Sequence, residues 1–67
     1  MKKFAERLKE LRTERNLTIL ALSKELKIGV ASICRWENGQ SDVKSEQLIV
    51  IAKFFGVTVD YILGLEN

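Results

Sequence analysis

The segment from Thr18 to Gly39 reads TILALSKELKIGVASICRWENG and predicts two short helices joined by a turn. Thr18 suits the start of the first helix because its hydroxyl can accept a hydrogen bond from a free amide of the first turn. This helix extends to about Leu26. The second spans about Val30 to Asn38 and stops at Gly39, which can adopt the left-handed conformation that helix ends favour. The turn is too short for a long antiparallel contact, so we expect the two helices to cross steeply.

Side-chain spacing predicts which faces of the two helices are buried. The apolar residues that can meet on the inside are Leu22, Leu26, Ile28, Ile33 and Trp36. The residues expected on the outside of the second helix are Val30, Ala31, Cys34, Arg35 and Asn38. A short helix held by its back, with an arginine and small side chains on its free face, fits the width of a DNA major groove.

Helical periodicity also governs the rest of the chain, and period-two alternation is almost absent. A first helix is predicted from Lys2 to Arg15, with Phe4, Leu8 and Leu11 on one face. A fourth covers Ser45 to Phe55 and stops at Gly56, and a fifth opens at Thr58 and ends near Gly64. The expected fold is all-α, a compact five-helix bundle that forms one domain over residues 1–67.

Composition narrows the range of functions. The chain has 46% hydrophobic and 30% charged residues, which is typical of a folded globular domain, and it contains no apolar run long enough for a membrane span or a signal peptide. We therefore expect a cytoplasmic protein. It has no histidine and one cysteine, Cys34, so the sequence predicts no metal site, no cofactor and no enzymatic activity.

The net charge of +2 is small, but its distribution is uneven. Residues 1–15 carry six basic and three acidic side chains, whereas residues 56–67 carry two acidic and no basic ones. The gradient is compatible with a surface for nucleic acid, and equally with a solvated helix face of Glu and Lys pairs.

The stretch ICRWENG, Ile33 to Gly39, resembles the I-x-R-W-E-N-G signature of the Cro and phage-repressor-like helix-turn-helix family, also called the xenobiotic response element type. The resemblance extends over nearly the whole chain. It continues in FAERLKELR at residues 4–12, NLT at 16–18, IAKFFGV at 51–57 and VDYILG at 59–64. It implies a lambda-repressor-like fold and binding to double-stranded DNA.

The resemblance also implies roles for individual residues. It sets the base-reading positions at Val30, Ala31, Cys34 and Arg35. Of these, Arg35 is the one suited to grip guanine O6 and N7 through two hydrogen bonds. Phosphate contacts are implied for Ser32, Asn38 and Gln40. Arg12 and Glu37 resemble the family's buried ion pair between the first helix and the end of the recognition helix.

Departures from the family pattern gather around the second helix. Ile19 and Leu20 follow Thr18, where the family commonly has a glutamine that binds a phosphate. Ser23 stands at a usual alanine, and Lys27 replaces the glycine of the turn at some backbone cost.

Some apolar residues lack an expected place in the core, and the resemblance implies a dimer contact on the fifth helix. Val50 and Phe54 lie away from the inward row of the fourth helix. The predicted dimer residues are Val59, Tyr61 and Ile62, although each could equally complete the core. Since one recognition helix reads about one half-site, we expect a homodimer that represses transcription from a palindromic operator. The alternative is an antitoxin-like module that also binds its own promoter and neutralises a protein partner, a toxin or another regulator, through Ile19 and Leu20.

Overall fold

The computed structural model describes residues 1–40 and 42–66; Ser41 and Asn67 lie outside them. The described residues form only helices and their connections, which confirms the all-α expectation. In chain order the helices are α1 (Lys2–Glu14), α2 (Ile19–Leu26), α3 (Val30–Glu37), α4 (Ser45–Phe55) and α5 (Val59–Ile62). Within this part of the chain no helix combines the length and apolar character needed to cross a membrane.

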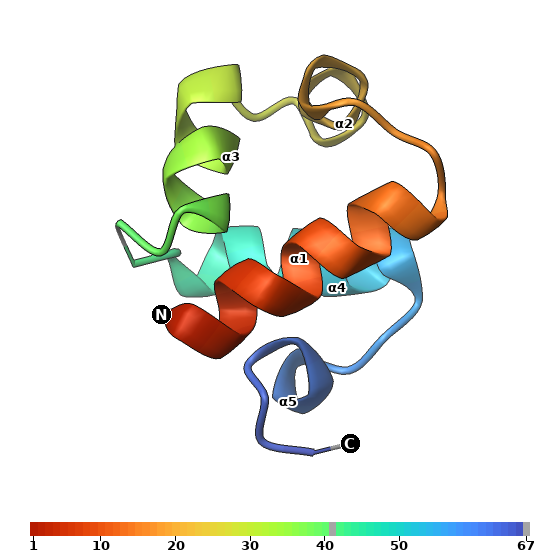
Figure 1. The fold of residues 1–67 in the computed structure, drawn as a ribbon. Helices are drawn as coiled ribbons and strands as arrows, with labels where there is room; N and C mark the ends of the chain where they lie inside the picture. Colours follow the sequence, from red (N-terminus) through yellow and green to blue (C-terminus); the bar gives the residue numbers. More distant parts are fainter. Residues whose placement is uncertain (41, 67) are drawn as a thin grey trace.

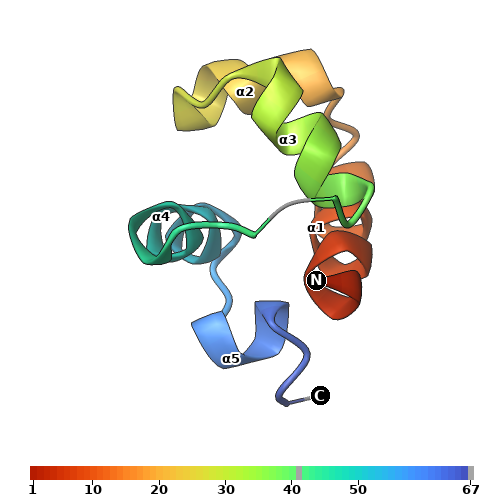
Figure 2. The ribbon, with the colours of Figure 1, turned by 90° about the vertical axis from the view of Figure 1, so that its left-hand side faces the viewer.

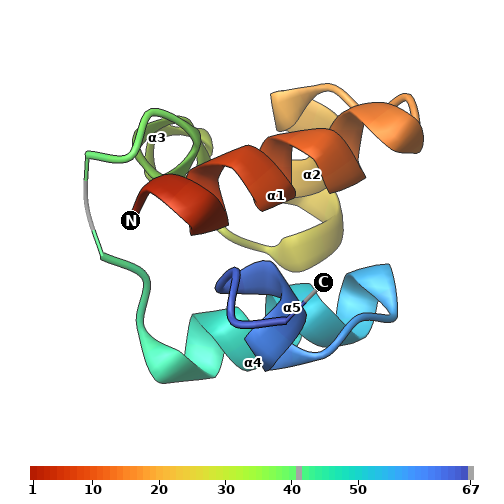
Figure 3. The ribbon, with the colours of Figure 1, turned by 60° about the horizontal axis from the view of Figure 1, so that its bottom comes forward.

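The five helices surround one core. Figure 2 shows α1 and α4 close to end-on, on opposite sides, with α2 and α3 closing one end and α5 the other. Helix α3 packs on α1 and α2, and α5 packs on α1 and α4. Figures 1 and 2 show α5 at the end opposite the α2–α3 pair, and in Figure 3 it lies in front of α4. The pair is thereby presented at one end of a body that measures 28 × 23 × 20 Å.

Local signals in the sequence account for the helix ends. The hydroxyls of Thr18 and Thr58 accept hydrogen bonds from the amides of Ala21 and Tyr61, both at 3.0 Å. Helix α4 ends at Gly56 with φ of +68°, a conformation that glycine adopts without a side-chain penalty. The predicted ends of α1 and α3 are each one residue too long, and the fifth helix is shorter than predicted because it forms a single turn.

The core is built from all five helices. Its completely buried large side chains are Phe4, Leu8, Leu22, Ile33, Ile51 and Ile62. Trp36 is 3% exposed, and its ring meets the ring of Phe4 edge to face with centroids 6.2 Å apart. Most predicted inward residues are therefore confirmed, while Leu11 and Ile28 are only partly buried. Phe54, predicted to face away, is half-buried and packs against this core.

Arg7 of α1 and Arg15, which caps the end of this helix, attach it to the second half of the chain. Arg15 donates from Nη1 and Nη2 to the carbonyl oxygens of Phe54 and Phe55, each at 3.1 Å, and so satisfies acceptors at the end of α4. Arg7 donates from Nη1 to the carbonyl oxygens of Tyr61 at 2.9 Å and Glu66 at 3.2 Å. Its guanidinium also lies 4.1 Å from the centroid of the Tyr61 ring. Sequence periodicity did not predict either contact.

Candidate nucleic-acid interface

Helices α2 and α3 form a helix-turn-helix unit (Figure 1). Ser23 stabilises its turn. The Ser23 hydroxyl donates to the carbonyl oxygen of Ile28, and the Ile28 amide donates back to the Ser23 carbonyl at 3.2 Å. Serine at this position therefore supplies a donor that alanine would lack. Lys27 adopts φ of +59°, so the expectation that a non-glycine residue tolerates this turn is confirmed.

Helix α3 buries one face and exposes the other. Ile33 and Trp36 anchor its back in the core at 0% and 3% exposure. On the opposite face Val30, Ala31 and Arg35 are exposed, and Cys34 is half-buried. The four predicted base-reading residues thus lie on one side of the helix, which we call its reading face. This is the arrangement expected of a helix that binds in the major groove.

The Arg35 guanidinium is accessible to a ligand. Its Nη2 lies 3.5 Å from the Ser32 hydroxyl, at the long limit for a hydrogen bond, so the guanidinium donors stay available. Ser32 itself is half-buried beside Arg35, whereas Asn38 and Gln40 are exposed beyond the other end of α3. The three predicted phosphate contacts are therefore split between two places.

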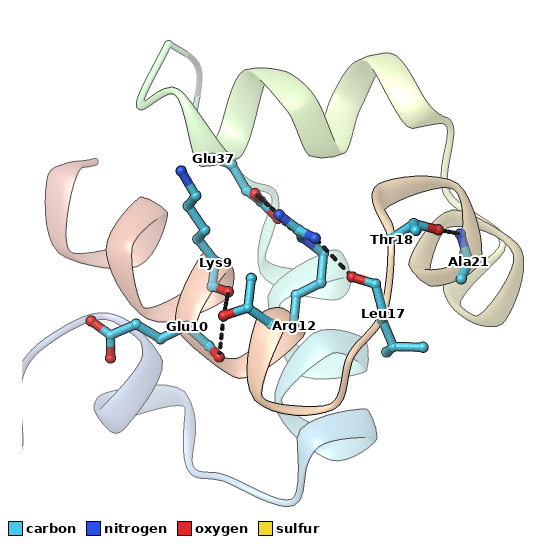
Figure 4. Close-up of polar contacts among 8 residues, drawn as sticks. Lys9, Glu10, Arg12, Leu17, Thr18, Ala21 and Glu37 are labelled. Atoms are coloured by element: carbon cyan, nitrogen blue, oxygen red, sulfur yellow. Dashed lines mark hydrogen bonds and ion pairs between the residues drawn. The ribbon is translucent and has the colours of Figure 1, made fainter.

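Arg12 joins α1, the connection that leads into α2, and the end of α3 (Figure 4). Its Nε and Nη2 donate to the two carboxylate oxygens of Glu37 at 2.7 and 3.0 Å, and its Nη1 donates to the Leu17 carbonyl at 2.7 Å. The Arg12 and Glu37 side chains are only 13% and 6% exposed. The ion pair that the resemblance implied is thus present, in a two-pronged geometry that fixes direction as well as distance.

The environment of Arg12 favours its charged form. The hydrogen bond to the Glu37 carboxylate is the largest cause that raises the pKa of Arg12 above its ordinary value, against a smaller opposing effect of burial. Since the folded-state pKa is raised, this contribution to stability is complete at neutral pH and is lost only when the pH rises through that pKa, in strongly alkaline solution. The pair therefore holds α3 in place across the physiological range.

One of the dimer contacts predicted on α5 is wrong. Ile62 is 0% exposed, so it belongs to the core of the monomer and offers no surface to a second copy. Val59 and Tyr61 are half-buried and retain accessible surface. On α4, Val50 is exposed as predicted, and its neighbour Ile49, which the sequence reasoning missed, is exposed to the same degree at 46%.

Comparison with known proteins places this geometry in a family. Residues 5–67 match the profile of a helix-turn-helix domain. The chain is 41% identical over 64 residues to the HTH-type transcriptional activator BcrR of Enterococcus faecalis, covering 96% of this chain and 31% of BcrR. It is 32% identical over 64 residues to the uncharacterized HTH-type transcriptional regulator YobD of Bacillus subtilis (strain 168), covering 96% of this chain and 57% of YobD. No solved structure matches.

The chain thus spans about a third of one relative and just over half of the other. The match nevertheless includes the helix-turn-helix unit and both partners of its ion pair. The chain belongs to the helix-turn-helix family of the Cro and phage-repressor-like type, a family of transcriptional regulators and not of enzymes.

Proposed function

We propose that this chain binds a specific sequence of double-stranded DNA by placing α3 in the major groove. The observation that carries the proposal is the contrast between the two faces of α3: Ile33 and Trp36 are buried, whereas Val30, Ala31 and Arg35 are exposed. The Arg12–Glu37 pair fixes the end of this helix, so the reading face is set before DNA arrives. A preset helix loses little conformational entropy on binding. The compartment proposed is the cytoplasm, where bacterial DNA is found.

Arg35 is the proposed reader of a guanine. It is exposed, it lies one turn beyond Ala31 on the free face, and its planar fork of donors matches guanine O6 and N7. Asn38 and Gln40 are proposed to bind phosphates, which would fix the register of α3 without reading sequence. Ser32 is also a proposed phosphate contact, and its hydroxyl lies 3.5 Å from the Arg35 guanidinium.

The proposed active form is a homodimer on an inverted repeat. One eight-residue recognition helix covers about one half-site, and two copies related by a two-fold axis would read half-sites roughly 34 Å apart. Val59 and Tyr61 remain the proposed contact, without Ile62. Repression by occupation of the operator is the proposed outcome. Because the relative BcrR is named an activator, a reporter gene placed behind the operator should be tested: lower expression supports repression, and higher expression contradicts it.

Selection from a random duplex library at two salt concentrations tests DNA binding and the inverted repeat together. The expected result is recovery of two related half-sites, with affinity that falls steeply as salt rises because phosphate contacts release bound counterions. Recovery of a single half-site would contradict the proposed dimer but not specific DNA binding. Retention without any enriched sequence would contradict specific DNA binding.

A protein-binding function is a second candidate because Leu20, at the start of α2, is 56% exposed. Ile19, which the sequence grouped with it, is half-buried against the core. In an antitoxin-like protein, Leu20→Ser would abolish binding to the protein partner and leave the fold intact. In a protein that acts only on DNA, the same substitution would leave promoter regulation unchanged in cells.

A further inference from the structure

The first two residues of α3, Val30 and Ala31, form the N-terminal tip of its reading face, and this tip is apolar. Val30 is 39% exposed and Ala31 is also exposed, although neither side chain has a polar atom. The N-terminal residues of a recognition helix contact the base edges in the major groove. The tip therefore faces the position where base pairs display their donors and acceptors, and it can bind none of them.

The major groove of DNA offers one apolar group, the C5 methyl of thymine. An apolar side chain gains by removing this methyl and its own surface from water, and it senses neither the O4 acceptor of thymine nor the N4 donor of cytosine. 5-Methylcytosine carries the same C5 methyl. Such a tip consequently distinguishes methylated from unmethylated pyrimidines and does not distinguish thymine from 5-methylcytosine.

The position of this methyl relative to the guanine follows from the helix. Ala31 and Arg35 are four residues apart and so lie on the same face, separated by about 6 Å along the axis at 1.5 Å per residue. Base pairs are spaced by about 3.4 Å. The methyl read by the tip therefore lies within about two base pairs of the guanine read by Arg35.

We propose that Val30 and Ala31 make this chain a reader of pyrimidine C5 methyl groups, so that methylation of cytosine creates a binding position equivalent to thymine. The inference rests on the proposed binding of α3 to DNA and specifies what that surface recognises. Burial of one methyl group gives about a fourfold change in affinity. Two methyls, one for each side chain, would give about fifteenfold if their effects add.

The experiment uses the operator recovered by selection, with one pyrimidine near the guanine changed at a time. Four versions are compared by equilibrium binding: thymine, uracil, cytosine and 5-methylcytosine, each with its Watson–Crick partner. The expected result is that thymine and 5-methylcytosine bind equally, each about fourfold more tightly than uracil and cytosine. Equal binding of thymine and uracil would overturn the inference, because these bases differ only by the methyl group.

Two variants of the tip and one control assign the effect to Val30 and Ala31. Val30→Ala is expected to reduce the thymine-to-uracil ratio at one position towards one. Val50→Ala, the same substitution at an exposed valine of α4, outside the helix-turn-helix unit, is expected to leave the ratio unchanged. An unchanged ratio in Val30→Ala and in Ala31→Gly would overturn the assignment, because a ratio measured within one variant is insensitive to the stability that glycine removes from a helix.

The outcomes separate this inference from the proposed function. Enrichment of no sequence would contradict both. Enrichment of a guanine-containing half-site that lacks thymine within two base pairs, or that tolerates uracil, would contradict only the methyl reader.

Discussion

The recognition helix α3 and the terminal helix α5 are both attached to α1 through an arginine, but in different surroundings. Arg12 meets the Glu37 carboxylate where both side chains are nearly buried, at 13% and 6% exposure. Arg7, which is half-buried, donates to the Tyr61 and Glu66 carbonyls and lies over the Tyr61 ring, all uncharged partners, and its bond to Glu66 is exposed. A buried charge that loses its partner cannot be rehydrated easily, whereas an exposed one can. We therefore expect α3 to be held rigidly on α1 and α5 to detach from it more easily.

The largest effect is expected for Glu37→Gln. It would leave the Arg12 guanidinium charged and nearly buried without a counter-charge, at a cost of about 3–5 kcal/mol in the free energy of unfolding. Urea denaturation measures this change. Glu10→Gln removes the same charge from an exposed position of α1 and should change stability by less than about 0.5 kcal/mol. Equal effects of the two substitutions would show that the Arg12–Glu37 pair is not a special attachment.

Arg35→Ala should show that base recognition by α3 is separate from the stability of the fold. The side chain is exposed, so we expect the melting temperature to remain unchanged while binding to the selected operator weakens by about 1–3 kcal/mol. Discrimination should relax at one base pair. Binding measured on operator and random DNA decides the role of Arg35: an equal loss on both would make it a phosphate contact.

A smaller loss is expected when the α5 attachment is cut by Arg7→Ala. The cation–π contact and the two hydrogen bonds of this half-buried arginine contribute about 0.5–1 kcal/mol each, so the free energy of unfolding should fall by about 2 kcal/mol. Hydrogen exchange should accelerate in α5 before α3. Lys9→Ala, an exposed charge loss on the same helix, serves as the control. A loss as large as that of Glu37→Gln would remove the distinction between the two attachments.

The smallest effect, with opposite sign, is expected in the turn that leads into α3. Lys27→Gly relieves a left-handed residue, and after the entropy that glycine adds to the unfolded chain we expect a gain of about 0.5–1 kcal/mol. Thermal denaturation measures this gain. Lys24→Gly, inside α2, should instead destabilise by about 1 kcal/mol. A loss of stability in Lys27→Gly would mean that the lysine side chain contributes more than its backbone costs.

Local signals explain what the sequence predicted well. Thr18, Gly39 and Gly56 mark helix ends through groups within a few residues of themselves, and the spacing of Ile33 and Trp36 defines the buried face of α3. The Arg12–Glu37 pair, 25 residues apart, was reached only through resemblance to a family.

Contacts between distant segments explain most of what was missed. Arg7 and Tyr61 are 54 residues apart, and Arg15 and Phe55 are 40 apart, so no local pattern relates them. Ile62 was assigned to the wrong surface because a helix of four residues is too short for periodicity to define its faces. The Ser23 hydroxyl was missed for a different reason, since its bond to the Ile28 carbonyl depends on the exact shape of the turn.

The contact between Trp36 and Phe4 provides an optical probe of the recognition helix. Trp36 is the only tryptophan of the chain, and its indole is enclosed behind α3 beside the Phe4 ring. Indole emission shifts to longer wavelengths when the ring moves from an apolar environment into water. A red shift under mild denaturant would therefore report the detachment of α3 from α1 directly, without a label. Comparing its midpoint with that of the helical circular dichroism signal would show whether α3 leaves before the rest of the bundle unfolds.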